Sequence, residues 1–251
     1  MAKPAPRSLS VLDSQRVSPS MLQITLGGPG LAGFPQDQTG GYIKLMLPDP
    51  AGGPKPVLRT YTIRAQRQAE IDVHFALHGG NANGLATGWA LAAERGDTIA
   101  IGGPGPAKPL PDGFDFYAVA GDMSALPAIS ANLERLGRDA KGVAVLEIQH
   151  RDDAIPIDAP AGIEICWIVN PKPGTEPGLL AGELRRQMKP DGKVAGWAAC
   201  EFSAMRELRA LLRGEWGLGP RELYISSYWK HGLDEIAHKK IKRQDAEEAG
   251  E

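Results

Sequence analysis

The sequence predicts a protein of two domains, an antiparallel β-barrel followed by an α/β domain with a parallel sheet. Short apolar segments bounded by Gly and Pro fill residues 8–110, a rhythm that is typical of a barrel or sandwich. After residue 113, apolar strands alternate with helices, which indicates a parallel sheet covered on both faces. The 251 residues are enough for two modest hydrophobic cores.

Six strands and one helix are expected in the first half. The strands are predicted over residues 9–17, 21–26, 42–47, 57–64, 71–77 and 98–101, and the helix over 85–93, directly after Gly84. Pro and Gly are so dense over 102–113 that we expect no regular element there, and we place the domain junction in this run. The first domain is therefore assigned to residues 1–112.

The second half reads as five strands and three helices. Strands are predicted over residues 116–120, 143–148, 163–169, 194–199 and 223–227, and helices over 125–136, 179–188 and 203–213. These elements make a second domain over residues 113–232. A charged tail follows over 233–251, in which Ile236 and Ile241 are too sparse for a strong amphipathic stripe. We expect a frayed helix there, up to Gln244, and a disordered terminus is the simpler alternative for the tail.

Charge and composition exclude several classes of partner. The formal net charge is −2, from 28 basic and 30 acidic residues, which gives no general attraction to nucleic acid or to an anionic membrane. Cys166 and Cys200 are too few for a disulfide framework, and the N-terminus has no apolar run behind its charges. We expect a reduced, cytoplasmic monomer without membrane insertion.

One segment of the first half combines three useful groups on a strand. Arg59 is suited to pair with a phosphate, Tyr61 to stack on an isoalloxazine ring, and Thr62, on the opposite pleat, to hydrogen-bond near the ring's N5 or O4. Taken alone, these residues only favour a strand. A helix start with small residues follows, and its free N–H groups attract phosphate. The residues of this second group are His78, Gly84, Ala86, Thr87 and Gly88. Together the two groups suit a flavin dinucleotide.

These motifs carry a family resemblance. Arg59-x-Tyr-Thr resembles the R-x-Y-[ST] signature of ferredoxin-reductase-like flavoproteins, and Gly84-Leu-Ala-Thr-Gly-Trp-Ala resembles a loop of siderophore-interacting proteins. The run from Gly121 to Ile129 is similar to the family's G-D-E-[TS]-A-L-P-A-I, with Met123 in place of Glu. The motifs follow the family's order over nearly the whole chain after residue 8. The resemblance implies an FAD-dependent reductase of ferric siderophores that takes electrons from NADPH, NADH or ferredoxin.

The expected donor site lies at the carboxyl ends of the parallel strands, where open α/β sheets bind their ligands. Gly121, Asp122 and Ser124 form the first turn, which on pattern alone is equally an ordinary capped βα turn. Arg151 follows the second strand and weakly favours NADPH over NADH, although a solvated loop arginine is the simpler interpretation.

Two further residues of the expected donor site come from one strand end. Cys200 and Glu201 belong to a segment that resembles the family's W-A-[AG]-x-E. In related reductases a cysteine here lies beside the nicotinamide ring. A small apolar filler is the alternative, and we expect Cys200 to shape the nicotinamide pocket rather than to carry electrons.

Cations are expected to hold an anionic ferric chelate. Lys230 is the main candidate, in a segment that resembles the family's G-Y-W-[RK]-x-G with Ser227 in place of Gly, and Arg206 is the second. The alternative for Arg206 is a solvated helix face. No side chain is given a catalytic role, because the flavin would carry the electrons, and no protein-bound metal is expected, because His74 and His78 have no third ligand at a recognisable spacing.

Two other functions stay open at this stage. The chain could be a flavin reductase or electron-transfer module with another acceptor, or a non-enzymatic protein that sequesters siderophores. The basic residues of the tail could cover the pocket mouth or meet an acidic carrier such as ferredoxin.

Overall fold

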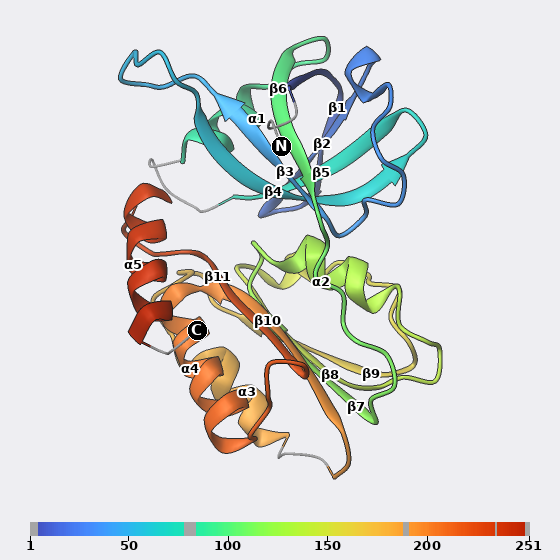
Figure 1. Ribbon diagram of the computed structural model, residues 1–251. Coiled ribbons are helices and arrows are strands. Elements are labelled where there is room, and N and C mark those ends of the chain that lie inside the picture. The colour runs from blue at the N-terminus through green and yellow to red at the C-terminus, as the bar shows by residue number, and fades with distance from the viewer. Residues whose placement is uncertain (1–4, 78–83, 188–190, 234, 249–251) are drawn as a thin grey trace. The chain divides into compact units, whose positions relative to one another are not determined.

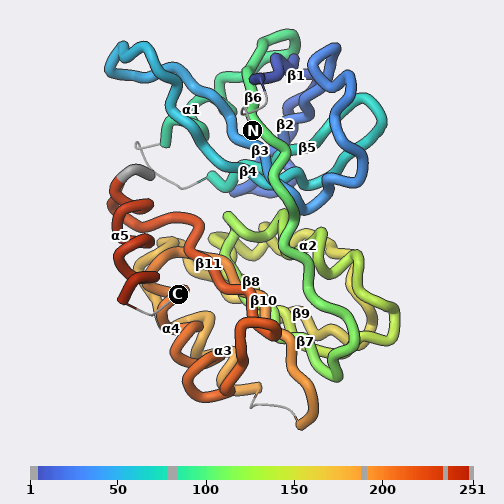
Figure 2. Tube along the Cα trace, in the orientation of Figure 1, coloured from blue at the N-terminus to red at the C-terminus, as the bar shows by residue number. Residues whose placement is uncertain are grey.

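The computed structural model describes residues 5–77, 84–187, 191–233 and 235–248 (Figures 1 and 2). The chain divides into two compact units. The first comprises Met1–Pro109 with Ser130–Asn132, and the second comprises Leu110–Ile129 with Leu133–Glu251. The domain boundary predicted after residue 112 stays a prediction. None of the described helices has the length and apolar character that crossing a membrane requires.

The first unit is a closed antiparallel barrel with the strand order β1-β2-β5-β4-β3-β6. Its strands are β1 (Arg7–Ser18), β2 (Met21–Gly27), β3 (Tyr42–Leu47), β4 (Val57–Arg67), β5 (Glu70–Ala76) and β6 (Thr98–Gly105). A short 3-10 helix, η1 (Pro29–Leu31), follows β2, and α1 (Leu85–Ala92) follows β5. The predicted barrel is therefore confirmed.

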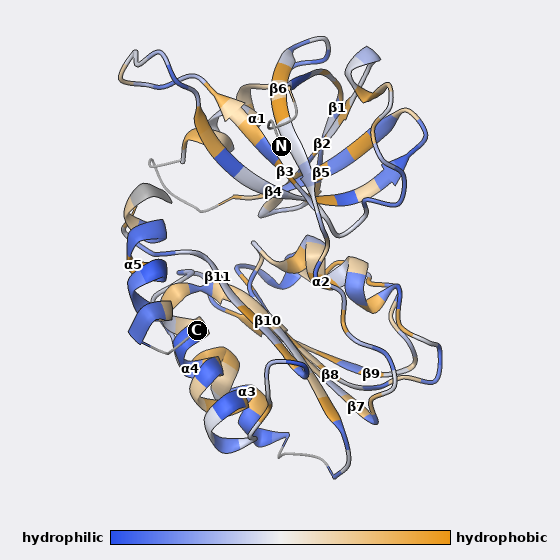
Figure 3. Ribbon diagram, in the orientation of Figure 1, coloured by the Kyte–Doolittle hydropathy of each residue, from blue (hydrophilic) through white to orange (hydrophobic). Residues whose placement is uncertain are grey.

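Alternation along each strand builds the barrel's core. Ile71, Val73 and Phe75 point inward from β5 and are completely buried, as are Ile43 and Leu45 on β3. Figure 3 shows the matching apolar stretches along the barrel strands. The apolar face of α1 adds Ala86 and Ala90 to this core.

The expectation of an irregular segment directly after residue 101 is wrong, because β6 continues to Gly105. Gly102 pairs with Lys44, and Gly105 pairs with Tyr42, with a register shift between the two pairs. The shift accommodates Pro104, which has no N–H to donate to the ladder. Gly105 is needed on this strand, because an added Cβ would lie 2.0 Å from Cζ of Tyr42.

The second unit is a five-stranded parallel sheet, as predicted, and its strand order is β11-β10-β7-β8-β9. Its strands are β7 (Phe116–Gly121), β8 (Lys141–Ile148), β9 (Gly162–Val169), β10 (Val194–Glu201) and β11 (Leu223–Trp229). Its helices are α2 (Leu126–Leu133), α3 (Leu179–Arg186) and α4 (Phe202–Arg209), and α4 runs on as a π-helical turn, η3 (Ala210–Glu215). A short 3-10 helix, η2 (Arg151–Asp153), lies between β8 and β9. The largest core cluster packs α3 and α4 on the sheet.

The tail differs from the frayed helix that the sequence predicts. It forms α5 (Glu235–Glu248), which lies beside β11 and α4 (Figure 1). His238 and Asp245 are buried, although α5 is largely hydrophilic in Figure 3. Polar partners on the neighbouring elements anchor it: Asp245 accepts 2.7 and 2.8 Å hydrogen bonds from the Arg209 guanidinium. Apolar periodicity in the sequence cannot predict a helix that is anchored by polar contacts.

Candidate functional site

Strand β4 places two of the predicted flavin-binding side chains on one face. Arg59 and Tyr61 are two residues apart and both are half-buried, while Thr62 lies on the opposite pleat. The Tyr61 ring lies 4.4 Å from the Phe75 ring, and Phe75 lies 5.9 Å from Trp89 of α1, centroid to centroid. These contacts fix the Tyr61 ring against the rim of the core, with part of it still accessible.

Among the described residues, no side chain caps the start of helix α1. Its N-cap residue, Gly84, makes no side-chain cap, and the first intrahelical bond runs from Gly88 N to Gly84 O at 2.8 Å. A Cβ added at either glycine would meet no atom within 4 Å among the described residues, and neither glycine has a positive φ. The glycines are thus not required by the backbone conformation, and no described residue fills the space beside them.

The arrangement fits a flavin dinucleotide. It offers a cation, an accessible aromatic ring and a helix N-terminus with room beside it, all within the first unit. Ala86 and Thr87, at the start of α1, are buried, so their side chains are not available to a ligand, whereas backbone N–H groups point out of the helix start. His78 lies outside the described residues.

In the second unit, Asp122 ties three strand ends together. It follows β7 and is buried, and its carboxylate accepts hydrogen bonds from Glu201 N at 2.8 Å and from Trp229 Nε1 at 2.7 Å. The amide N–H of Ser124 donates to the other carboxylate oxygen at 2.9 Å, and the Ser124 hydroxyl also bonds it. Burial raises the pKa of Asp122, and these hydrogen bonds oppose the shift.

Glu201 holds the predicted substrate cation. Its Oε1 accepts a 2.9 Å hydrogen bond from Lys230 Nζ and a 3.2 Å bond from His231 N, while Oε2 caps α4. Lys230 Nζ also donates to Ser203 Oγ at 2.7 Å. The Lys230 side chain is 25% exposed and that of Glu201 only 2%, so a buried carboxylate compensates the lysine charge.

A third acid lies at the same edge and is missed by the sequence analysis. Glu147, near the end of β8, is buried and accepts a 2.9 Å hydrogen bond from Asn170 Nδ2. Burial raises the pKa of Glu147 to about 7, and the nearby charge of Asp122 adds to the shift. Its signal in the sequence is an acid inside the apolar run of β8. In the parts of the chain that the structure describes, no three acidic, His or Cys side chains are arranged to hold a metal ion.

Comparison with known proteins identifies the family. Residues 114–232 match the family described as siderophore-interacting protein, and residues 10–54 and 49–108 match the siderophore-interacting FAD-binding domain. The chain belongs to the siderophore-interacting proteins. This family assignment confirms the predicted resemblance and the choice of FAD as the cofactor.

Three relatives of this siderophore-interacting protein are informative. Ferric vibriobactin reductase ViuB of Vibrio cholerae is 35% identical, over 93% of this chain and 92% of ViuB. NADPH-dependent ferric-chelate reductase of Escherichia coli is 26% identical, over 89% and 92% of the two chains. The crystal structure of the siderophore-interacting protein SipS from Aeromonas hydrophila is 33% identical and superposes with a TM-score of 0.84, covering 96% of this chain and 98% of SipS.

The ferredoxin-NADP+ reductase of Plasmodium falciparum shares the fold. It is 12% identical and superposes with a TM-score of 0.65 over 89% of this chain and 96% of its own. The predicted two-part architecture is therefore confirmed at the level of the fold.

Only some of the predicted donor-site and substrate residues of this siderophore-interacting protein lie in one hydrogen-bonded network. Asp122, Ser124, Glu201 and Lys230 are linked by hydrogen bonds, and Gly121 lets β7 approach β10, since an added Cβ would lie 2.7 Å from Ala199 O.

The other three predicted residues lie apart from this network. The Cys200 side chain lies in the core cluster, and burial raises the pKa of its thiol well above the usual value, which keeps it protonated. Arg151 is exposed at the start of η2. Arg206 lies on α4, and its Nε is 3.5 Å from Oδ1 of Asp245.

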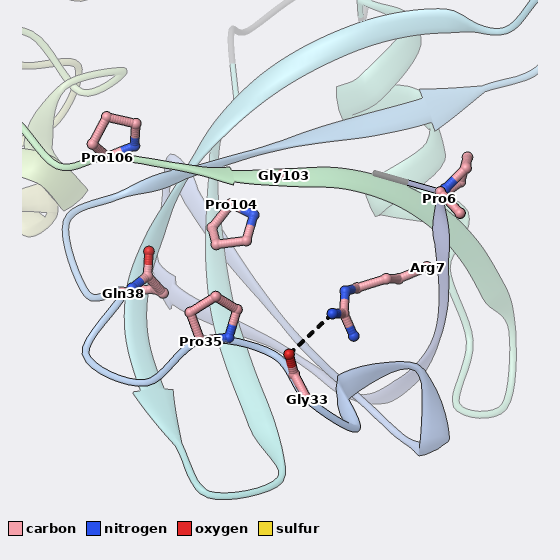
Figure 4. Close-up of a pocket in the computed structure, with 9 residues that line it drawn as sticks. Pro6, Arg7, Gly33, Pro35, Gln38, Gly103, Pro104 and Pro106 are labelled. Atoms are coloured by element: carbon pink, nitrogen blue, oxygen red, sulfur yellow. Dashed lines mark hydrogen bonds between the residues drawn. The ribbon is translucent and has the colours of Figure 1, made fainter. Parts of the chain in front are cut away.

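A separate hollow of 750 Å³ lies in the first unit (Figure 4). Its walls include Pro35, Pro104 and Pro106, and Arg7 lies beside it. The Arg7 guanidinium donates to the carbonyl oxygens of residues 30, 32 and 33, at 2.8, 2.7 and 3.1 Å, so it serves to hold the segment around η1. None of the predicted flavin-binding residues that the structure describes lines this hollow.

Proposed function

We propose that this siderophore-interacting protein is an FAD-dependent reductase of ferric siderophores in the cytoplasm, which releases iron as Fe(II) with electrons from NAD(P)H or ferredoxin. The observation that carries the proposal is the likeness to ferric vibriobactin reductase over nearly the whole of both chains. The FAD-binding domain match and the geometry of β4 and α1 support it.

FAD, when bound, supplies both two-electron and one-electron chemistry, which suits a hydride donor and an iron acceptor. In the proposal Arg59 pairs with a phosphate of FAD, and the first N–H groups of α1 meet the diphosphate beside Gly84 and Gly88. Tyr61 covers the flavin ring, and Thr62 donates a hydrogen bond to it. His78 contributes from the segment just before α1.

NADPH is the donor that we favour. The named activity of the Escherichia coli relative supports it, and Arg151 supplies a cation for a 2′-phosphate. Gly121, Asp122, Ser124 and Glu201 shape the carboxyl edge on which the nicotinamide half would lie. The buried Cys200 side chain fills space in the core under this edge and so shapes the nicotinamide pocket. NADH and ferredoxin stay as alternative donors, and the chain acts as a monomer in this proposal.

Lys230 is the cation that we propose for an anionic ferric siderophore, with Arg206 as a secondary attraction. Replacing Lys230 by Ala should raise the dissociation constant of the chelate, and replacing it by Arg should not, because Arg keeps the charge. Surface attraction is screened over about 8 Å at physiological ionic strength. The wild-type advantage should therefore shrink as salt rises, and equal affinities of wild type and Lys230→Ala at low salt would remove Lys230 from the proposal.

The overall function is tested with the purified protein. Bound flavin gives a yellow colour with absorbance at about 450 nm, and mass spectrometry of the released chromophore distinguishes FAD from FMN. Stopped-flow reduction with NADPH, NADH and reduced ferredoxin then ranks the donors, and a ferrous-specific chelator traps the released Fe(II). Flavin reduction without Fe(II) release would favour a reductase for another acceptor. Siderophore binding by a flavin-free protein would favour sequestration.

A further inference from the structure

His238, on α5, contacts Ser227 and Phe202, of which Ser227 is close to Lys230 in the chain and Phe202 is close to it in space. Its Nε2 is hydrogen-bonded to the hydroxyl of Ser227, three residues before Lys230 on the same chain segment. Its ring also lies edge-on to the Phe202 ring, with 6.5 Å between centroids. The Lys230 ammonium in turn lies 5.9 Å from the centre of the Phe202 ring. His238 and Ser227 are both buried, with 5% and 2% of their surfaces exposed.

The hydrogen bonds of Ser227 define which partner donates. The Ser227 hydroxyl donates to the carbonyl oxygen of Trp229 at 3.2 Å, and a hydroxyl has only one hydrogen to give. Both bonds form together only in the tautomer in which His238 Nε2 carries the hydrogen and donates to Ser227 Oγ. The two bonds in series connect α5 to the backbone of Trp229, which directly precedes Lys230.

Helix α5 is anchored to both elements that hold Lys230. Lys242 donates to Ser226 Oγ at 2.7 Å and to Ser227 O at 2.9 Å, which fixes α5 to β11. Asp245 binds Arg209, which fixes α5 to α4, the helix whose first turn supplies Ser203 to Lys230. His238 lies one helical turn before Lys242 on α5.

We infer that His238 is a positioning residue for Lys230. Its hydrogen bond fixes the end of β11, and its ring fixes Phe202, so that the Lys230 ammonium stays between Glu201, Ser203 and the Phe202 ring. The inference deepens the proposed function, since the positioned cation is the one assigned to the ferric siderophore. The positioning role of His238 can be tested by a measurement that involves no siderophore.

The test compares three His238 variants in the FAD-loaded full chain. His238→Gln keeps an N–H donor close to the position of Nε2, His238→Phe keeps only the ring, and His238→Ala keeps neither. The readout is the rate at which acetic anhydride labels Lys230, followed by peptide mass spectrometry. We expect labelling to rise by at least about threefold in the Ala and Phe variants, because a released amine is more often exposed, and to stay near the wild-type rate in the Gln variant. Lys240→Ala, on the exposed side of α5, is the control.

Several outcomes would overturn the inference. Unchanged Lys230 labelling in both the Phe and Ala variants would do so, and so would an equal rise at the distant Lys193, since that indicates general destabilisation. Ser227→Ala offers a second route, because it removes the hydroxyl that receives the His238 hydrogen bond and should reproduce the Phe result.

Siderophore affinity is then measured in the same variants. A weaker affinity in His238→Phe than in His238→Gln supports the link to substrate. If Lys230→Ala leaves siderophore affinity unchanged while the labelling pattern holds, the role of Lys230 in the proposed function fails and the positioning role of His238 stands.

Discussion

At the scale of single residues, the carboxyl edge of the second unit concentrates three buried acids within one sheet. Glu147 is the one whose protonation should be visible, because burial and the charge of Asp122 raise its pKa from 4.5 to about 7. A carboxyl group with a raised pKa in the folded state favours folding while it is protonated. Its contribution is complete below pH 4.5 and is lost as the pH rises through 7.

Replacing Glu147 by Gln should therefore stabilise the protein above pH 7 and have little effect near pH 4.5. We expect a gain on the order of 1–3 kcal/mol at pH 8, because a pKa shift of one unit corresponds to about 1.4 kcal/mol. Urea denaturation of both proteins at the two pH values measures it, with the exposed Glu176→Gln as the control. A gain that is the same at both pH values would show that Glu147 does not titrate in this range.

Arg59 gives a second prediction at this scale. Replacing it by Ala should weaken FAD retention by about 1.5–3 kcal/mol, through the loss of a charge-assisted phosphate contact. Equilibrium dialysis with FAD measures the change. Arg16→Ala, near the end of β1, removes the same charge elsewhere in the barrel and should leave FAD affinity unchanged. An Arg59 variant with wild-type affinity would place the phosphate elsewhere.

Sequence patterns locate several site residues but not their hydrogen-bond partners. Asp122 belongs to a recognisable motif, yet its donors Glu201 and Trp229 lie 79 and 107 positions further along the chain. Only the strand order brings them together. The same limit applies to the pairing of Lys230 with Glu201, which a local pattern cannot reveal.

At the scale of elements, two glycines should respond in opposite directions. Gly182 lies inside α3, where an added Cβ meets nothing within 4 Å among the described residues, so Gly182→Ala should stabilise by about 0.5–1 kcal/mol. Gly105→Ala places its Cβ against the Tyr42 ring and should destabilise by about 1–3 kcal/mol. Thermal denaturation measures both, and a stabilising Gly105→Ala would contradict the packing described for β3 and β6.

Most elements follow from hydrophobic periodicity because their buried faces are apolar. The exceptions have other causes. The end of β6 pairs with β3 despite its Gly and Pro content, because a register shift absorbs Pro104. Helix α5 is held through His238, Lys242 and Asp245, whose partners on β11 and α4 cannot be identified before those elements are in place.

At the scale of the whole molecule, each compact unit has its own hydrophobic core, so heating should produce two transitions rather than one. FAD binds the first unit in our proposal. Adding it at a hundredfold excess over its dissociation constant should stabilise that unit by about 2.7 kcal/mol. Calorimetry with and without FAD should show one transition moving and the other staying. A single transition that moves as a whole would show that the two units unfold together.

The closed barrel and the open sheet should differ in how well they protect backbone amides from hydrogen exchange with the solvent. Within the described strands, each of the six in the barrel has a neighbour on both sides, while β9 and β11 end the five-stranded sheet. At β11, α5 reaches the carbonyl of Ser227 through Lys242. Deuterium should therefore enter β9 before it enters β8 or β7, and the barrel strands should take it up more evenly.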